Sequence, residues 1–153
     1  MKKAKLVVVV GLPGSGKSHL IKSKIYSKWP KYDDYFAKVA TGSPIKREPS
    51  VTDSFYYQEL IEQLLAGQSC LISDVIFCDS LLRHALEIAI KLDAPSAKIE
   101  WIYFENNPEV CIRNARKRAR PATLAREIKL IKYLSRKYFV PTKAKPKACY
   151  SAS

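Results

Sequence analysis

The chain has 153 residues, a length typical of one domain, and 47% of them are apolar. This composition is that of a globular protein and excludes a disordered or fibrous chain. The longest uninterrupted apolar run, Leu6–Val10, is far shorter than the roughly 20 residues that a membrane-spanning helix needs. We therefore expect a soluble, cytoplasmic protein without a membrane partner.

The formal net charge of +13 is concentrated toward the end of the chain. Residues 105–153 contain 13 Lys and Arg against 3 Asp and Glu, whereas residues 1–104 contain 14 against 11. This asymmetry predicts an anionic partner, either phosphate groups or nucleic acid. A basic surface that only aids solubility is the alternative. The four cysteines form no CxxC pair, so we expect neither a disulfide framework nor a zinc site.

Short buried strands alternate with amphipathic helices along the chain. The first half is expected to contain a strand at Lys5–Val10, a helix at Ser18–Lys28, a strand end at Tyr32–Phe36, a loop at Gly42–Ser50, and a helix capped by Thr52 or Asp53 and ended by Gly67. The second half is expected to contain a strand at Cys70–Ser73, a helix from Asp79 or Ser80 to Leu92, and a strand at Ile99–Phe104. Two helices follow, one begun by Asn107-Pro108-Glu109 and one from about Ala122 to Tyr138. The expected core positions are Leu20, Ile21 and Ile25 in the first helix, Leu82, Ala85, Leu86, Ala89 and Leu92 in the third, and Leu124, Ile128, Ile131 and Leu134 in the last. The alternation predicts one α/β domain over residues 1–153, a three-layer α/β/α sandwich with a parallel sheet.

The segment Gly11–Ser18 matches the pattern G-x-x-x-x-G-K-[ST] in full. Glycines let successive backbone N–H groups point at one anion, and the following helix directs its positive end there. In this pattern Lys17 reaches the β- and γ-phosphates, and the Ser18 hydroxyl binds Mg²⁺. The expected nucleotide-binding residues are Gly11, Pro13, Gly14, Ser15, Gly16, Lys17, Ser18 and His19. The alternative is a glycine-rich strand–helix turn that holds no ligand.

Two acidic positions favour phosphoryl transfer to a bound acceptor. Asp74 ends a buried strand, where it can hold Mg²⁺ together with Ser18 or contact the acceptor. Asp33-Asp34 comes 16 residues after Lys17, where a carboxylate can take the acceptor's proton. The alternatives are a helix cap or solvated turn for the pair, and a loop cap for Asp74. No N-K-x-D motif for guanine occurs in the sequence.

The basic residues after Pro108 predict a lid over the phosphates at about residues 108–121, followed by a basic tail at 141–153. Arg113, Arg116, Lys117 and Arg120 follow helical spacing and form one cationic face, with Arg118 as the other candidate. Guanidinium groups in that position stabilise charge on the transferring phosphoryl group. A further basic stripe, Arg126, Lys129, Lys132 and Arg136, favours electrostatic contact with nucleic acid. A solvated basic helix is the alternative, and Arg83 belongs either to the site or to the surface.

These residues together resemble a known family. Gly11–Ser18, Tyr32-Asp33-Asp34-Tyr35, Leu71-Ile72-Ser73-Asp74 and Ile112–Arg118 occur in the order and approximate spacing of small P-loop kinases, most nearly the kinase domain of polynucleotide 5′-hydroxyl kinases, with zeta-toxin-like kinases as relatives. The resemblance implies a P-loop NTPase fold of the nucleotide-kinase type with a helical lid, Asp33 as general base, and Asp74 as a contact to acceptor or metal. Phe36 stands near the place where that family has an arginine for an acceptor phosphate, so the acceptor stays open.

The sequence thus predicts an ATP- and Mg²⁺-dependent phosphotransferase that acts on a hydroxyl group. The catalytic residues would be Lys17, Asp33, Asp74, Arg113, Arg116 and Arg120. A polynucleotide 5′-hydroxyl is one acceptor, and a small metabolite or a nucleoside is the alternative. A protein that binds or hydrolyses ATP on nucleic acid, without kinase activity, is the rival from another class.

Overall fold

The computed structural model describes residues 3–36, 50–118 and 120–151. Within them lies a four-stranded sheet in the order β2-β3-β1-β4, made of β1 (Lys5–Val10), β2 (Lys31–Asp33), β3 (Cys70–Ser73) and β4 (Lys98–Tyr103). Every pairing is parallel, so the carboxyl ends of the strands meet at one edge of the sheet. The predicted strands at Lys5–Val10 and Cys70–Ser73 are confirmed with the same bounds.

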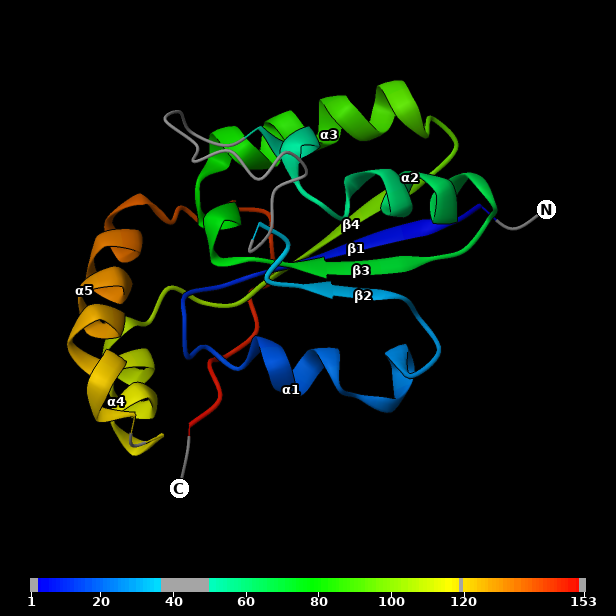
Figure 1. Ribbon diagram of the computed structural model, residues 1–153. Helices are drawn as coiled ribbons and strands as arrows, with labels where there is room; N and C mark the ends of the chain where they lie inside the picture. Colours follow the sequence, from blue (N-terminus) through cyan, green and yellow to red (C-terminus); the bar gives the residue numbers. More distant parts are fainter. Residues whose placement is uncertain (1–2, 37–49, 119, 152–153) are drawn as a thin grey trace.

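Helices cover both faces of the sheet. The helices are α1 (Lys17–Ile21), α2 (Tyr57–Leu65), α3 (Ser80–Asp93), α4 (Pro108–Lys117) and α5 (Pro121–Lys137), with 3₁₀ turns at Lys24–Tyr26, Val51–Asp53 and Val75–Cys78. Figure 1 shows α2 and α3 over one face, α1 over the other, and α4 and α5 together beyond the carboxyl ends of the strands. The predicted α/β/α sandwich with a parallel sheet is confirmed. None of the helices in the described ranges is long and apolar enough to cross a membrane.

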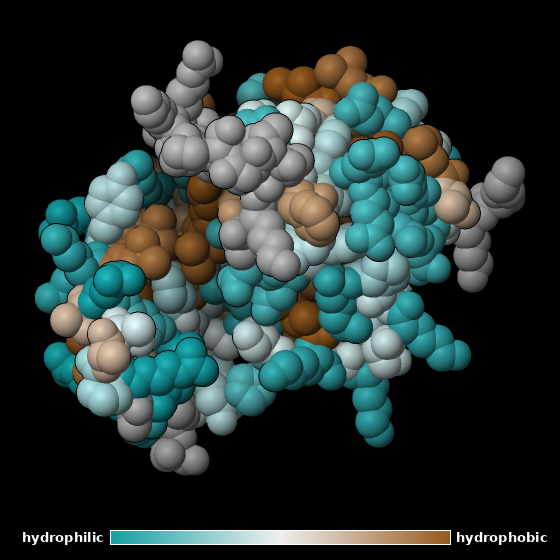
Figure 2. All heavy atoms as spheres, viewed as in Figure 1, coloured by the Kyte–Doolittle hydropathy of each residue, from teal (hydrophilic) through white to brown (hydrophobic). Residues whose placement is uncertain are grey.

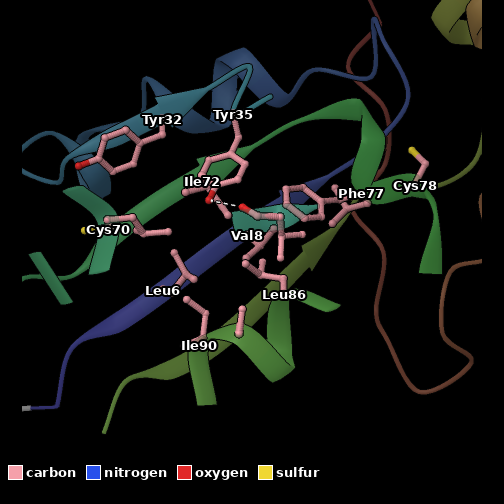
Figure 3. Close-up of a cluster of buried hydrophobic side chains, with 14 of the residues drawn as sticks. Leu6, Val8, Tyr32, Tyr35, Cys70, Ile72, Phe77, Cys78, Leu86 and Ile90 are labelled. Atoms are coloured by element: carbon pink, nitrogen blue, oxygen red, sulfur yellow. Dashed lines mark hydrogen bonds between the residues drawn. The ribbon is translucent and has the colours of Figure 1, made fainter. Parts of the chain in front are cut away.

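β1 is buried on both faces because its side chains alternate between two apolar clusters. Leu6, Val8 and Val10 belong to the larger cluster, while Val7 and Val9 belong to a smaller one with Ile21 of α1. Figure 3 shows the larger cluster, in which side chains from the sheet, from α3 and from the turn after β3 converge. This two-sided burial explains the apolar run without polar alternation.

The first helix is shorter than the spacing predicts. α1 ends at Ile21, and Ser23 takes an extended backbone conformation (φ −67°, ψ 155°) before the 3₁₀ turn at Lys24–Tyr26. The break turns Tyr26 into the core and leaves Ile25 76% exposed. The predicted helix to Lys28 and the predicted burial of Ile25 are therefore wrong.

The inward face of α3 also differs from the expectation. Asp79 caps the helix as predicted, with its Oδ1 accepting a hydrogen bond from the Leu81 N–H (2.9 Å). Leu86, Ala89 and Ile90 are buried, but Leu92 is 76% exposed, because the helix is rotated toward Arg83 and Ile90. Leu81, Ile88 and Leu92 leave an apolar strip on its outer side, seen at the top of Figure 2.

The predicted end of α2 is confirmed, but its predicted N-terminal cap is wrong. Neither Thr52 nor Asp53 caps α2, since Ser50 caps the preceding 3₁₀ turn and Tyr56 stands before α2 without a side-chain cap. Gly67 follows α2 with a positive φ of 84°, as expected for a helix end. The loop predicted at Gly42–Ser50 lies outside the described residues except for Ser50 itself.

The C-terminal segment continues the sheet beyond β4. Phe104 and Lys147 form a parallel bridge, in which the Lys147 N–H donates to the Tyr103 carbonyl and the Glu105 N–H to the Lys147 carbonyl (2.8 Å each). The Tyr138 hydroxyl, at the end of α5, donates to the Phe104 carbonyl. These contacts lead the last described residues back toward the turn that follows β1.

Candidate functional site

The turn between β1 and α1 has a backbone that only its glycines permit. Gly14 and Gly16 have φ angles of 81° and 107°, which side-chain-bearing residues rarely adopt. A Cβ added to Gly11 would lie 2.5 Å from the Ser15 Oγ, and one added to Gly14 would lie 2.9 Å from the Cys111 carbonyl oxygen. The turn is therefore a tight cradle lined by backbone groups, the form that binds phosphate groups.

Lys17 lies in the middle of this cradle. Its Nζ donates to the carbonyl oxygens of Gly11 (2.9 Å) and Leu12 (2.8 Å). Burial lowers the pKa of Lys17 from its ordinary 10.5, while the carboxylates of Asp33 and Asp74 act in the opposite direction. A buried ammonium group whose bonds go to carbonyl dipoles is well placed to exchange them for phosphate oxygens.

The polar side chains of the cradle fit an anion with a bound cation. The Ser15 Oγ and the Ser73 Oγ are buried and have no hydrogen-bond partner within the described ranges. Ser18, at the start of α1, is exposed, so its hydroxyl is free to reach a metal. No group of three His, Cys, Asp or Glu side chains that could hold a metal occurs in the part of the chain that the structure describes. A cation here would keep most of its water ligands, as Mg²⁺ does.

The two predicted acids lie at neighbouring strand ends. β2 ends at Asp33, which pairs in register with Ser73, and Asp74 follows directly. Asp33 is exposed, and among the described residues its carboxylate accepts only a local hydrogen bond, from the Asp34 N–H to Oδ1 (3.0 Å). Asp34 has a positive φ of 51° and turns the chain sharply away from the strand. One carboxylate oxygen of Asp33 thus stays available at the sheet edge.

Asp74 is held more rigidly than Asp33. Its Oδ1 accepts from the Ile76 N–H (3.0 Å) and its Oδ2 from the Phe36 N–H (2.9 Å), so it caps the turn after β3 and also fixes the chain after β2. Burial raises the pKa of Asp74 above its ordinary 3.8, whereas these two N–H groups and Lys17 lower it. The structure therefore gives Asp74 the capping role named as an alternative, next to the cradle.

One face of α4 contacts the cradle directly, and it carries a residue that our reading of the sequence missed. The Asn114 Nδ2 donates to the Gly14 carbonyl (2.9 Å) and to the Tyr150 carbonyl (2.5 Å). Asn114 is buried between Cys111 and Ala115 on the apolar side of the helix. An asparagine within an apolar helical stripe was the signal, since a buried amide requires partners.

Arg118 of the lid lies beside the cradle. A Cβ on Gly14 would lie 3.5 Å from the Arg118 Nη2, and the same nitrogen pairs with the Glu127 carboxylate of α5. Arg113 and Arg116 instead line a groove between α4 and α5, on the side of α4 that faces away from Asn114. Arg120 is exposed at the start of α5. Packing of Cys111 and Asn114 sets the rotation of α4 and turns Arg113 and Arg116 away from the cradle in this structure. The grouping of Arg113, Arg116 and Arg120 over the phosphates stays a prediction.

The C-terminal segment covers one side of the cradle. The Tyr150 N–H donates to the Ser15 carbonyl (2.9 Å), and a Cβ on Gly16 would lie 2.7 Å from the Tyr150 Cβ. The rings of Tyr150 and His19 lie 4.1 Å apart between centroids. His19 was expected to bind nucleotide; in this structure its ring contacts Tyr150. Nothing in the sequence pattern pointed to Tyr150.

Arg83 is neither in the site nor on the surface. It is 7% exposed and donates to the carbonyls of Phe77 (2.8 Å), Cys78 (3.2 Å) and Phe139 (2.9 Å), and its guanidinium lies over the Tyr103 ring. The side chain therefore joins the turn after β3 to the end of α5.

The fold is that of P-loop kinases. Over 97% of this chain and 83% of the other, the structure is similar to that of a gluconokinase from Sinorhizobium meliloti 1021, with a TM-score of 0.57 and 16% sequence identity. It is also similar to a chain of the Pnkp1/Rnl/Hen1 RNA repair complex, with a TM-score of 0.53 and 20% identity, over 100% of this chain and 51% of that one.

No family model matches the sequence. Over 118 residues the chain is 31% identical to the uncharacterized protein R277 of Acanthamoeba polyphaga mimivirus, and the match covers 74% of this chain and 72% of R277. The chain belongs to the same family as R277.

Proposed function

We propose that the protein is a kinase that transfers the γ-phosphoryl group of ATP to a hydroxyl acceptor. The observation that carries the proposal is the position of Lys17, whose Nζ lies in a glycine cradle after β1, on the same edge of the sheet as Asp33 and Asp74 at two adjacent strand ends. A protein that only bound nucleotide would need the cradle but no carboxylate with an available oxygen beside it. In this proposal residues 1–153 are one domain, and the lid comprises about residues 108–121.

The cradle would bind the phosphates of ATP through the backbone N–H groups of Gly14–Ser18 and through Lys17. Ser18 would ligate Mg²⁺, with Asp74 contacting the metal through water. Bound MgATP supplies the γ-phosphorus, whose bond to the β,γ-bridging oxygen breaks as its bond to the acceptor oxygen forms, leaving ADP.

Asp33 would take the proton that the acceptor hydroxyl loses. Its second carboxylate oxygen accepts no hydrogen bond from residues 3–36, 50–118 or 120–151, whereas both oxygens of Asp74 already accept backbone hydrogen bonds. This division of roles favours Asp33 as the base and Asp74 as the group that fixes the chain beside it.

The lid arginine that would stabilise the transferring phosphoryl group is Arg118, assisted by Arg120. Arg118 Nη2 already lies close to Gly14, so a small movement of its side chain brings it over bound phosphates. Arg113 and Arg116 have no part in this proposal for transfer. The basic residues of 105–153 favour an anionic acceptor such as a polynucleotide 5′-hydroxyl end over a neutral metabolite.

The test is a transfer assay with γ-³²P-labelled ATP and a panel of hydroxyl acceptors, including 5′-hydroxyl oligonucleotides, nucleosides and sugar acids. We expect label on one acceptor class, no transfer by Lys17→Ala, and transfer by Asp33→Asn reduced by about 10²–10⁴-fold with unchanged ATP binding. Asp34→Asn is the matched control, because it removes the neighbouring charge and should keep most of the activity. ATP hydrolysis without labelled acceptor, at a rate insensitive to Asp33→Asn, would instead indicate the rival ATP-binding protein.

A further inference from the structure

A groove of about 360 Å³ lies between α4 and α5. Its lining residues are Glu109, Ile112, Arg113 and Arg116 of α4, and Ile128 and Lys132 of α5. The cradle contacts the opposite side of α4, through Asn114 and the Cys111 carbonyl. The groove is therefore separate from the candidate nucleotide site.

The charges in the groove are unbalanced. Arg113, Arg116 and Lys132 bring three cationic groups to it against the single carboxylate of Glu109. Within residues 3–36, 50–118 and 120–151, none of these three cationic groups forms a hydrogen bond or an ion pair. Arg118, by contrast, is paired with Glu127 a short distance away. Three unpaired cations facing one hollow create a site for an anion.

The groove also has an apolar part, provided by the half-buried side chains of Ile112 and Ile128. Its volume is near the lower end of the ~300–1,000 Å³ range of small-ligand pockets, so it can admit one nucleotide unit but not a base pair. Phosphate oxygens suit the guanidinium groups, and a sugar or base edge suits the isoleucines.

Cationic side chains continue past the groove along α5. Lys129 and Arg136 are exposed one turn to either side of Lys132. A small anion would fill the groove and leave these charges unused, whereas a chain of phosphates would meet them in succession.

We propose that the α4–α5 groove binds the backbone of single-stranded nucleic acid, with one nucleotide seated between Arg113, Arg116 and Lys132. The binding is largely independent of sequence, because phosphates supply most of the contacts. It goes beyond the proposed kinase activity, since the groove lies away from the cradle and needs no phosphoryl transfer to bind.

The test measures fluorescence anisotropy of a labelled 12-nucleotide DNA single strand against the full chain at 50–200 mM salt. The variant Arg113→Gln/Arg116→Gln/Lys132→Gln removes three charges with residues that favour helix. We expect it to lose tenfold or more in affinity at 50 mM salt. The slope of the logarithm of the association constant against log[salt] should become less negative by about 2, because each of the three lost phosphate contacts contributes roughly 0.7.

A matched control removes the same charge elsewhere. Lys22→Gln/Lys28→Gln/Lys91→Gln neutralises three exposed lysines distant from the groove, and should change DNA affinity by less than about threefold. Binding of a fluorescent ATP analogue by both triple variants shows that they are folded and that the cradle is intact. Equal losses in the two variants would overturn the proposal, because the attraction would then be diffuse.

Two further outcomes would also overturn it. One is the absence of DNA binding by the wild-type chain at 50 mM salt. The other is displacement of the labelled strand by thymidine monophosphate at micromolar concentration, which would make the groove a mononucleotide site. The kinase proposal survives each of these results, and failure of the transfer assay leaves the DNA-binding result unaffected.

Discussion

At the scale of single residues, Asn114 contributes more to the cradle than its place in a helix suggests. Its amide donates to the Gly14 carbonyl and to the Tyr150 carbonyl, so this one side chain of α4 links the helix to the cradle and to the C-terminal segment. Asn114 is buried and both hydrogen bonds are partly shielded from water, so they are more costly to lose than hydrogen bonds at the surface.

Replacing Asn114 by Ala should therefore destabilise the protein by about 1–3 kcal/mol and weaken ATP binding, because Gly14 loses its support. Urea unfolding and titration with a fluorescent ATP analogue measure the two effects. Arg116→Ala, on the exposed side of the same helix, should change neither by a measurable amount. An Asn114→Ala variant with wild-type ATP affinity would show that the cradle keeps its shape without this contact.

Asp74 provides a prediction about pH. Burial raises the pKa of Asp74 in the folded protein, so the folded state binds this proton more tightly than the unfolded state does. The contribution of the Asp74 carboxyl to the free energy of unfolding is then fully present below about pH 3.8, and it is lost as the pH rises through the folded-state pKa.

The stability of wild type relative to Asp74→Asn should thus increase as the pH falls from 7 toward 4. Urea unfolding of both proteins at several pH values gives the difference. A difference that shrinks on acidification would mean that the N–H groups of Ile76 and Phe36 outweigh burial.

At the scale of elements, the pairing of α4 with α5 decides which arginine can serve the site. The Arg118–Glu127 ion pair joins the end of α4 to α5, and both side chains are partly exposed. Pairs of this kind contribute about 0–1 kcal/mol, so the interaction restrains Arg118 without locking it.

Glu127→Gln should release Arg118 toward bound phosphates and tighten ATP binding by up to about fivefold, the equivalent of that 0–1 kcal/mol. Titration of wild type, Glu127→Gln, Arg118→Gln and the double variant forms a cycle that isolates the coupling. If Arg118 contacts phosphate, the gain disappears in the Arg118→Gln background. A gain that persists there would assign the effect to the loss of negative charge alone.

At the scale of the whole molecule, Arg83 connects parts of the chain that are far apart in sequence. Its guanidinium satisfies carbonyls of the turn after β3 and of the residues after α5, and packs on Tyr103 of β4. The turn after β3 also contains the segment that Asp74 caps, so Arg83 holds the acidic edge of the site against the C-terminal half.

Arg83→Met should cost about 2–5 kcal/mol, because it leaves buried carbonyls without donors while filling similar space. Chemical unfolding of the variant measures this loss. Lys91→Met, exposed on the same helix, is the control and should have an effect within about 0.5 kcal/mol. Equal stability of the two variants would contradict the connecting role of Arg83.

Much of the fold and part of the site could be predicted without coordinates, because the signals are local. Backbone preferences within a few residues determine three of these features: the apolar strand β1, the glycine cradle with Lys17 and Ser18, and the Asn107 cap of α4. The acids at the strand ends followed from the rule that parallel strands present their carboxyl ends at one edge.

The rotation of each helix about its axis could not be predicted in the same way. Spacing groups Arg113 and Arg116 on one face of α4, but only the packing of Cys111 and Asn114 against the cradle decides that this face points away from it. Leu92 is exposed for the same reason, since periodicity defines a face and not its direction. Ile25 is exposed for a different reason, because α1 ends at Ile21 and Ile25 lies in the 3₁₀ turn that follows.

Local sequence thus determines which segments form strands, helices and the cradle. Contacts between residues about a hundred positions apart, such as Asn114 with Gly14 and Tyr138 with Val10, decide which side chains meet at the site. Those contacts depend on the summed burial of the whole core, and no short stretch of sequence contains that information.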